Sequence, residues 1–458
     1  MSNQENCPVP KPELFQYNRR EVIKRIVSAG AEGAVLMFGF PEQGRVLTDY
    51  DPYFRQESYF WYMTGVNEPD CALYIDIKTG KSILFYQDVP QEMAIWSGEQ
   101  PTLEEIRVKY GFDEIYLINS LSDYVSKQNP AFLHTAVESL VVGDFRVTTE
   151  YLLDAINEQR QIKSANEIEL IKHNAKINSL AYSRVLQTLR PGMYEYEVEG
   201  EMQYVYYSQN CRYPPFQLTI CSGELCSILH YHKKSRKIND GDLVLIDAGG
   251  EYSMYCSDNT RTFPSNGKYS DDQRLIYNSV LEAQKAVIRT AKPGVSWVDI
   301  ALLSVRVMCE NLIKIGLLNG TVDEIMSHHI MSVFYPHGLG HGLGLDVHDV
   351  AGWPKGVERP KAPHIEHLRF GRVLEPGMVL TVEPGCYFIP MLFNEALNDP
   401  VKAKFINKEM CLRMHKSVGG VRIEDDILIT EDGCENLSEG IPKEIEEIEE
   451  IMRKAKNN

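Results

Sequence analysis

The sequence has no run of about 18 consecutive apolar residues, the length that a membrane-spanning helix requires. Its first residues are polar and lack the apolar core of a secretory signal. Ten cysteines are scattered along the chain without CxxC pairs or a framework spacing. In a chain of this length, such cysteines are typical of free thiols in a reducing compartment. We therefore expect a cytoplasmic protein that does not cross a membrane.

Basic residues are few relative to acidic ones. The chain has 47 lysines and arginines against 64 aspartates and glutamates, so its net charge is −17. This excess of negative charge disfavours nucleic acid and anionic membranes as partners. Low-complexity tracts are also absent, and the apolar fraction of 43% and the charged fraction of 24% are ordinary for a globular protein. The composition therefore predicts a folded protein whose partner is neither nucleic acid nor a membrane.

The length predicts two domains, because 458 residues exceed the size of one typical core. Residues 1–160 are interpreted as a mixed α/β domain without a cluster of metal ligands of its own. Within this domain we expect a helix over about residues 21–30 and a strand over residues 34–38. Residues 72–76 and 82–86 predict a β-hairpin, since a turn sequence that contains glycine separates two apolar runs.

The boundary between the two domains is expected at residues 161–164. Ser164 can cap the helix that follows it, and Glu167 stands three residues further on, which completes the pattern of a capping box. This helix is predicted over residues 165–189.

An internal duplication follows this boundary. Pro191-Gly192 ends the predicted helix, and a second Pro-Gly pair at residues 293–294 also separates two helical stretches. Helix, Pro-Gly, helix, strand and carboxylate thus occur twice, which predicts a pseudo-symmetric, two-lobed α/β (α+β) domain over residues 161–458. A terminal helix is expected to dock on this domain through one apolar face, formed by Ile445, Ile448 and Met452.

Two copies of one short pattern carry the first candidate site residues. Residues 241–249 and 377–385 each contain a glycine turn, an apolar run, a carboxylate and a second turn. The apolar runs predict buried strands, so Asp247 and Glu383 stand at strand ends. One such carboxylate is more often a turn residue or a cap. Two at matching positions favour a functional site, because charged groups near a core must be paired or bound to metal.

Three more residues extend this set. Asp258 follows Asp247 by eleven residues, a spacing that suits a hairpin, and His341 and Glu424 lie in glycine-containing stretches further along the chain. Carboxylates with one imidazole suit ions such as Mn²⁺, Fe²⁺, Co²⁺ or Zn²⁺. Four carboxylates carry too much charge for one divalent ion, but they suit two ions that share ligands.

In this order, Asp247, Asp258, His341, Glu383 and Glu424 resemble the metal ligands of the proline-specific metallopeptidases with the pita-bread fold. This family includes prolidase (Xaa-Pro dipeptidase), aminopeptidase P and, more distantly, methionine aminopeptidase. The resemblance runs from about residue 54 to the C-terminus. It implies two divalent metal ions per chain, with Mn²⁺ as the expected ion and Zn²⁺ or Co²⁺ as alternatives. It also implies a small peptide substrate and a homodimer whose N-terminal domain approaches the partner's active site.

The resemblance also assigns roles to neighbouring residues. His230 and His348 match substrate-facing histidines, either of which could stabilise the oxyanion. His337 matches a histidine that either supports the metal ligands or handles protons. Each alone would more often be a structural histidine. Glu383 matches the family's proton acceptor as well as a metal ligand. Arg422 stands two residues before Glu424, on the same side of the strand, and is expected to neutralise the carboxylates.

The choice of substrate within the family depends on other segments. Residues 391–417 resemble prolidase, and Arg369 matches a prolidase arginine that binds the C-terminal carboxylate of the dipeptide. These features predict hydrolysis of the Xaa-Pro bond in dipeptides with C-terminal proline. The link from His230 to Asp247 is shorter than in eukaryotic prolidases, and residues 243–249 are closer to bacterial aminopeptidase P. Release of an N-terminal residue from longer Xaa-Pro peptides is therefore the alternative. A non-catalytic pita-bread binding module is a remote alternative, because all five ligands are present.

Overall fold

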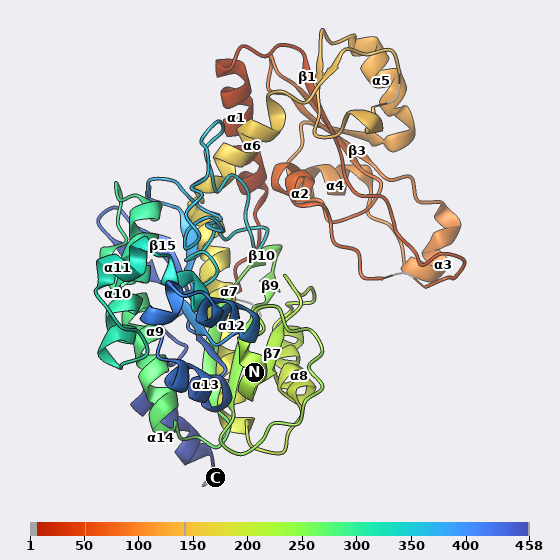
Figure 1. The fold of residues 1–458 in the computed structure, drawn as a ribbon. Helices are drawn as coiled ribbons and strands as arrows, with labels where there is room; N and C mark the ends of the chain where they lie inside the picture. Colours follow the sequence, from red (N-terminus) through yellow and green to blue (C-terminus); the bar gives the residue numbers. More distant parts are fainter. Residues whose placement is uncertain (1–6, 51, 142, 457–458) are drawn as a thin grey trace. The chain divides into compact units, whose positions relative to one another are not determined.

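The structure, a computed structural model, describes residues 7–50, 52–141 and 143–456. The described residues divide into two compact units, Pro8–Glu167 and a second that contains Cys7 and residues 168–456. Both units contain helices and strands, so the expected α/β (α+β) class is confirmed (Figure 1). No helix among the described residues is both long enough and apolar enough to span a bilayer.

The first unit is built on one mixed sheet with the strand order β4-β3-β2-β1-β5-β6. Its central pairings, β1 with β2 and β2 with β3, are antiparallel, whereas the outer pairings are parallel. The strands are β1 (Ala34–Phe38), β2 (Ala72–Asp76), β3 (Ser82–Tyr86), β4 (Glu114–Leu117), β5 (Leu133–His134) and β6 (Val147–Thr148). The predicted strand over residues 34–38 and the predicted hairpin are therefore confirmed, with the expected bounds.

Among the described residues of this unit, six α-helices accompany the sheet: α1 (Pro12–Ser28), α2 (Ser58–Thr64), α3 (Ala94–Ser97), α4 (Leu103–Tyr110), α5 (Leu121–Gln128) and α6 (Leu152–Gln161). Short 3₁₀ helices are η2 (Gln91–Met93), η3 (Ile118–Ser120) and η4 (Glu138–Leu140). The helix expected over residues 21–30 begins earlier than predicted. Pro12 occupies its first turn, where proline is favoured because its missing N–H has no partner there. In α2, the buried rings of Phe60, Trp61 and Tyr62 pack into the core.

The long helix α7 (Ala165–Thr188) connects the two units along the chain. Its predicted capping box is present. The Ser164 backbone N–H donates to Glu167 Oε2 at 2.7 Å, and the Glu167 N–H donates to Ser164 Oγ at 3.5 Å. The helix has nearly the predicted length, because capping at its start and Pro-Gly after its end are local signals.

The second unit repeats one arrangement, as the sequence predicts. The first copy contains α7, α8 (Glu195–Ser208) and the sheet β11-β8-β7, and the second contains α9 (Asp271–Thr290), α10 (Trp297–Lys314) and the sheet β12-β15-β16. The strands of these sheets are β7 (Thr219–Ser222), β8 (Leu243–Ala248), β11 (Asn259–Pro264), β12 (Val379–Val382), β15 (Asp425–Ile429) and β16 (Cys434–Asn436). Each ladder between these named strands is antiparallel. An isolated bridge between Thr260 and Glu424 joins the two copies.

Shorter elements complete this unit. Two further pairs of strands are β9 (Glu251–Tyr252) with β10 (Tyr255–Cys256), and β13 (Gly385–Tyr387) with β14 (Gly420–Arg422). The remaining helices are α11 (Val322–Ser327), α12 (Pro390–Asn398), α13 (Lys408–Ser417), α14 (Ile445–Lys456), η5 (Gly223–Ser227), η6 (Ile330–Val333) and η7 (Lys402–Phe405). The expected apolar face of α14 is buried, with Ile445, Ile448 and Met452 each at most 2% exposed.

Candidate metal centre and active site

The first two candidate ligands lie on adjacent antiparallel strands. Asp247 is the fifth residue of β8, and its neighbour across the ladder is Thr260 of β11. Asp258 comes directly before β11. The backbone at Gly249 approaches its partner so closely that an added Cβ would lie 1.7 Å from the Ser257 carbonyl oxygen. This close approach turns the chain between the strands and brings the two aspartates to one end of the sheet.

The second copy supplies the other two carboxylates in the same way. Glu383 directly follows β12, and Glu424 stands between β14 and β15. The Glu424 backbone N–H donates to the Thr260 carbonyl oxygen at 3.0 Å, which places it against β11 of the first copy. The five candidate ligands therefore come from four strand ends and one glycine-rich loop that holds His341. Strand ends predicted from local sequence patterns are brought together by the pairing of the two copies.

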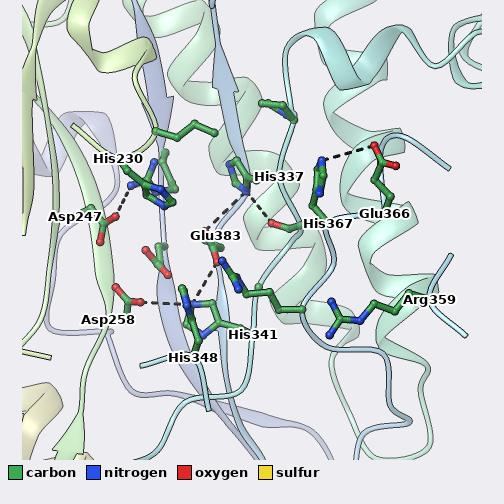
Figure 2. Close-up of a pocket in the computed structure, with 17 residues that line it drawn as sticks. His230, Asp247, Asp258, His337, His341, His348, Arg359, Glu366, His367 and Glu383 are labelled. Atoms are coloured by element: carbon green, nitrogen blue, oxygen red, sulfur yellow. Dashed lines mark hydrogen bonds and ion pairs between the residues drawn. The ribbon is translucent and has the colours of Figure 1, made fainter. Parts of the chain in front are cut away.

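All candidate site residues of the sequence line one cavity of about 480 Å³ (Figure 2). It is lined by the predicted ligands Asp247, Asp258, His341, Glu383 and Glu424, and by His230, His337, His348, Arg369 and Arg422. Three further charged or titratable residues at this cavity escaped the sequence analysis: Arg359, Glu366 and His367. They belong to the same segment as Arg369, which has no regular secondary structure and so gives no periodic pattern to interpret.

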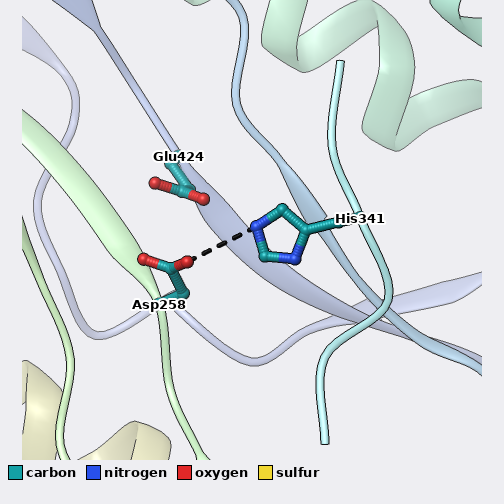
Figure 3. A group of neighbouring side chains, drawn as sticks. All are labelled: Asp258, His341 and Glu424. Carbon is teal, nitrogen blue, oxygen red and sulfur yellow. Dashed lines mark ion pairs between the residues drawn. The ribbon is translucent and has the colours of Figure 1, made fainter. Parts of the chain in front are cut away.

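The tightest group of ligand atoms belongs to Asp258, His341 and Glu424, whose candidate ligand atoms lie within 4.8 Å of one another (Figure 3). His341 Nε2 lies 3.5 Å from Asp258 Oδ2 and 3.5 Å from Glu383 Oε1. His341 Nδ1 lies 3.0 Å from the Gly342 carbonyl oxygen, and a proton on Nδ1 leaves the Nε2 lone pair toward the carboxylates. Asp258 Oδ1 is buried without a hydrogen-bond partner among the described residues. A divalent ion would satisfy both groups, so these residues fit a metal site.

Arg422 connects the carboxylates to neighbouring side chains. Its Nη2 lies 2.5 Å from Asp247 Oδ2, and its Nε donates to Thr260 Oγ1 at 2.9 Å. Thr260 Oγ1 in turn donates to Glu424 Oε2 at 2.7 Å. The guanidinium, whose side chain is 6% exposed, thus fixes one carboxylate directly and a second through a hydroxyl group. Such contacts orient metal-binding carboxylates.

The carboxylates of the cavity hold protons strongly when no cation is bound. Burial raises the pKa of Asp258 and of Glu424 well above the ordinary range, and the neighbouring carboxylates raise it further. Burial raises the pKa of Glu383 to about 8, although the charge of Arg422 opposes this change. Like charges in a poorly solvated space cannot all ionise unless cations join them. Two divalent ions would supply the missing positive charge.

The pKa values of the histidines of the cavity are lowered instead, so these side chains are neutral at physiological pH. Burial lowers the pKa of His337 and of His348 to about 3 and that of His341 to about 4. Burial also lowers the pKa of His230, and the charge of Arg422 adds to this effect. Neutral imidazole can bind a metal ion through one nitrogen or donate one hydrogen bond to a substrate, as metal ligation and oxyanion stabilisation require.

Tyr387 is a site residue that the sequence analysis missed. Its hydroxyl accepts a hydrogen bond from Arg422 Nη1 at 2.9 Å and lies 2.9 Å from His337 Nε2. His337 Nδ1 lies 2.8 Å from the Gly338 carbonyl oxygen, which can only accept, so Nδ1 carries the proton and Nε2 accepts from Tyr387. No sequence pattern marks Tyr387, because its ring is positioned by the pairing of β13 with β14: it lies opposite Gly420, where an added Cβ would lie 2.8 Å from the tyrosine ring.

Arg369 lies in the irregular segment that leads into β12. It lines the cavity with an exposed side chain, so its guanidinium is available to a ligand. The segment is held by the Trp353 indole N–H, which donates to the Leu368 carbonyl oxygen at 2.9 Å. It is also held by the Gly371 N–H, which donates to the Gly352 carbonyl oxygen at 2.8 Å. These contacts place a cation beside a cavity rich in carboxylates.

Comparisons with known proteins agree with this geometry. The family model of metallopeptidase family M24 matches residues 169–431, and that of the aminopeptidase P N-terminal domain matches residues 15–131. The chain is 41% identical to the Xaa-Pro dipeptidase of Rattus norvegicus, over 96% of this chain and 93% of the relative. It is 36% identical to the Xaa-Pro aminopeptidase of Escherichia coli (strain K12), over 96% of this chain and 97% of the relative.

A solved structure extends the similarity to the fold. The structure of aminopeptidase P from E. coli with the inhibitor Pro-Leu matches 98% of this chain and 100% of its own chain, with a TM-score of 0.84 and 33% sequence identity. The predicted architecture, an N-terminal mixed α/β domain followed by a pita-bread domain, is thereby confirmed.

Proposed function

The chain belongs to metallopeptidase family M24, and we propose that it hydrolyses the Xaa-Pro bond of dipeptides that end in proline. The resemblance to prolidase and aminopeptidase P that the motifs predicted is confirmed, since relatives with both names match nearly the whole chain. The dipeptidase activity is supported by the 41% identity to the Xaa-Pro dipeptidase of the rat.

The convergence of five ligand-type side chains with an exposed arginine in one cavity supports this activity. We assign Asp247, Asp258, His341, Glu383 and Glu424 as the residues that hold two divalent ions. Mn²⁺ is the proposed ion, with Zn²⁺ and Co²⁺ as alternatives, because carboxylates with one imidazole suit all three. When bound, two such ions supply Lewis acidity for peptide hydrolysis and make water a stronger nucleophile at neutral pH.

The side chains of the cavity divide the remaining tasks. Glu383 accepts the proton that the attacking water loses and passes it to the proline nitrogen as the C–N bond breaks. His230 and His348, both neutral, donate hydrogen bonds to the developing oxyanion. The hydrogen bond from Tyr387 orients the imidazole of His337. Its Nδ1 then lies 3.9 Å from Oε2 of Glu383, the proton acceptor. Arg422 holds the Asp247 carboxylate in place through their ion pair.

Arg369 supplies dipeptide selectivity in this proposal. A dipeptide presents a free carboxylate directly after the proline ring, and a cation must neutralise that charge when it enters the cavity. The planar guanidinium of arginine can pair with both oxygens of a carboxylate. A longer peptide has an amide at this position and gains nothing from the cation.

Release of an N-terminal residue from longer Xaa-Pro peptides is the second candidate function. It is favoured by the similarity to E. coli aminopeptidase P, both in sequence and in fold. The two activities separate in one assay, in which the chelated protein is reloaded with Mn²⁺ and given Gly-Pro, Ala-Pro and an Xaa-Pro-Yaa tripeptide at equal concentrations. Faster turnover of the dipeptides supports the first function, and faster turnover of the tripeptide assigns the second.

The proposed assembly is a homodimer in which residues 1–160 serve dimerisation and access to the active site, and residues 161–458 serve catalysis. Large apolar side chains of the first unit support an interface, because Leu47 is 100% exposed and Ile95 and Trp96 are each 81% exposed. Sedimentation of the Ile95→Ser/Trp96→Ser variant tests this assembly. It should sediment as a monomer where the unmodified chain is a dimer, and a fully active monomeric wild type would contradict the proposal.

We also propose a cytoplasmic location. None of the ten cysteines, all of which lie among the described residues, forms a disulfide. Many of these thiols are buried, and burial raises the pKa of Cys386 and Cys411 above the ordinary value. Inert thiols without disulfides are typical of proteins in reducing compartments.

A further inference from the structure

Two histidines outside the cavity face each other through the same ring nitrogen. His329 Nδ1 lies 3.3 Å from His364 Nδ1, and their ring centroids are 5.3 Å apart. His329 directly precedes η6, with a positive φ of 55°, and His364 lies in the irregular segment between Trp353 and β12. Both side chains are half-buried. Neither residue lines the cavity of the candidate metal centre.

The separation of the two nitrogens matches two ligands of one ion. Bonds of 2.0–2.1 Å from a tetrahedral ion to imidazole place two nitrogens about 3.3–3.4 Å apart, and the two ring centroids about 5.2 Å apart. The observed values are 3.3 Å and 5.3 Å. A hydrogen bond between the rings requires one Nδ1 to carry a proton, whereas a cation is bound between them when both Nδ1 atoms are unprotonated.

Burial keeps the imidazole of His364 in the form that binds metal. Burial lowers the pKa of His364, and the charge of a protonated His329 would lower it further, so His364 is neutral at physiological pH. Neutral imidazole is the state that ligates Zn²⁺, Ni²⁺ and Cu²⁺. Partial exposure leaves room for water to complete the coordination of the ion.

The pair joins two segments that both contact the candidate active site. η6 leads within a few residues to His337. His364 belongs to a turn in which the Ile365 and Glu366 N–H groups donate to the Ala362 carbonyl oxygen at 2.9 and 2.8 Å. This turn continues to Arg369 and packs closely on the chain beside His337, since a Cβ on Gly338 would lie 2.8 Å from Leu368 Cα. A bond across the pair would therefore restrain the segment that carries Arg369.

We propose that His329 and His364 form a third metal site, separate from the dinuclear centre, that takes a divalent ion with a preference for imidazole, such as Zn²⁺. The bound ion links residues 362–369 to the start of η6 and so holds Arg369 at the cavity; this link is called the clip below. Two protein ligands bind more weakly than the five of the centre, so the clip fills only when free Zn²⁺ exceeds the concentration that loads the centre. The site does not depend on which peptide the enzyme cleaves.

Equilibrium dialysis of the full chain against buffered Zn²⁺, with metal counted by mass spectrometry, tests this site. The variants are His329→Asn and His364→Asn, and the matched control is His328→Asn. Asparagine tolerates the positive φ of residue 329 better than other side chains. His328 is exposed and adjacent to the pair, and its Nδ1 lies 2.8 Å from the Glu324 carbonyl oxygen. Circular dichroism and activity with Mn²⁺ alone verify that each variant is folded.

The wild type and His328→Asn should each bind one more ion per chain than either variant of the pair. Equal ion numbers in all four proteins, or an equal loss in the control, would overturn the site. The clip itself is tested with trypsin, because Lys361 lies three residues before His364 and is exposed. Zn²⁺ should slow cleavage after Lys361 several-fold in the wild type but not in His364→Asn. Equal cleavage rates in both proteins would overturn the clip.

Discussion

Replacing Glu383 with glutamine should stabilise the metal-free protein at pH 8 while it removes the hydrolytic activity. The carboxylate is half-buried, with 19% of its side chain exposed, and its partial removal from water raises its pKa from the ordinary 4.5 to about 8. The folded chain therefore holds a proton that the unfolded chain releases. Glutamine has nearly the same shape and never ionises, so the variant escapes the cost of a buried negative charge.

Proton linkage determines the direction in which the stability of the wild type changes with pH. A group whose pKa is higher in the folded state stabilises the fold below its unfolded pKa, and this stability is lost as pH rises toward the folded pKa. For Glu383 the loss extends from about pH 4.5 to about pH 8. At about 1.36 kcal/mol per pKa unit, the loss reaches on the order of 4 kcal/mol at pH 8 and about 1 kcal/mol at pH 5. The free energy of unfolding of the metal-free variant should exceed that of the metal-free wild type by these amounts.

Thermal unfolding in the presence of a chelator measures this difference. Since 1 kcal/mol moves the midpoint of a large domain by roughly 2 °C, the variant should unfold roughly 8 °C above the wild type at pH 8 and only about 2 °C above it at pH 5. The control is Glu375→Gln, because Glu375 is exposed in the loop before β12. Adding Mn²⁺ should stabilise the wild type far more than the variant, and Gly-Pro hydrolysis by the variant should fall by orders of magnitude. Equal unfolding midpoints of the two metal-free proteins at pH 8 would refute the reasoning. A difference between their midpoints that stays the same at pH 5 and pH 8 would refute it as well.

Four further outcomes test the remaining site residues. Arg369→Ala should raise KM for Gly-Pro by an amount equivalent to about 2–5 kcal/mol, while KM for the C-terminally amidated analogue stays nearly constant; equal increases would remove its role in carboxylate binding. Tyr387→Phe should lower kcat about tenfold with little change in KM, because His337 loses the hydroxyl that fixes it; steady-state kinetics with an unchanged kcat would contradict this link. Glu424→Gln should leave fewer than two Mn²⁺ per chain by metal analysis of a folded protein, whereas two retained ions would exclude Glu424 as a ligand. The affinity for Mn²⁺ should fall as pH drops from 8 to 5, because Asp258 and Glu424 must lose protons to bind it, and dialysis that shows a constant affinity would argue against this coupling.

The sequence by itself determined the elements whose signals lie within a few residues of one another. The hairpin of residues 72–86, the capped helix from Ala165 and the two copies of the strand-and-carboxylate pattern are all present as predicted. Turn residues, caps and apolar runs act locally, and they fix the structure of a short segment whatever surrounds it. The start of α1 was missed because Pro12 and the residues after it lack a strong apolar period, although proline in the first turn was the available signal.

The ordered series of Asp, Asp, His, Glu and Glu indicated a site before any fold was known, yet its geometry depended on the tertiary structure. Pairing of β8 with β11, and of Thr260 with Glu424, brings carboxylates from positions far apart in the chain to one cavity. The same holds for Tyr387, which links Arg422 to His337, and for the facing rings of His329 and His364. No local pattern marks these contacts, because each is formed by side chains from different segments that only the packing of the folded chain places within hydrogen-bond distance.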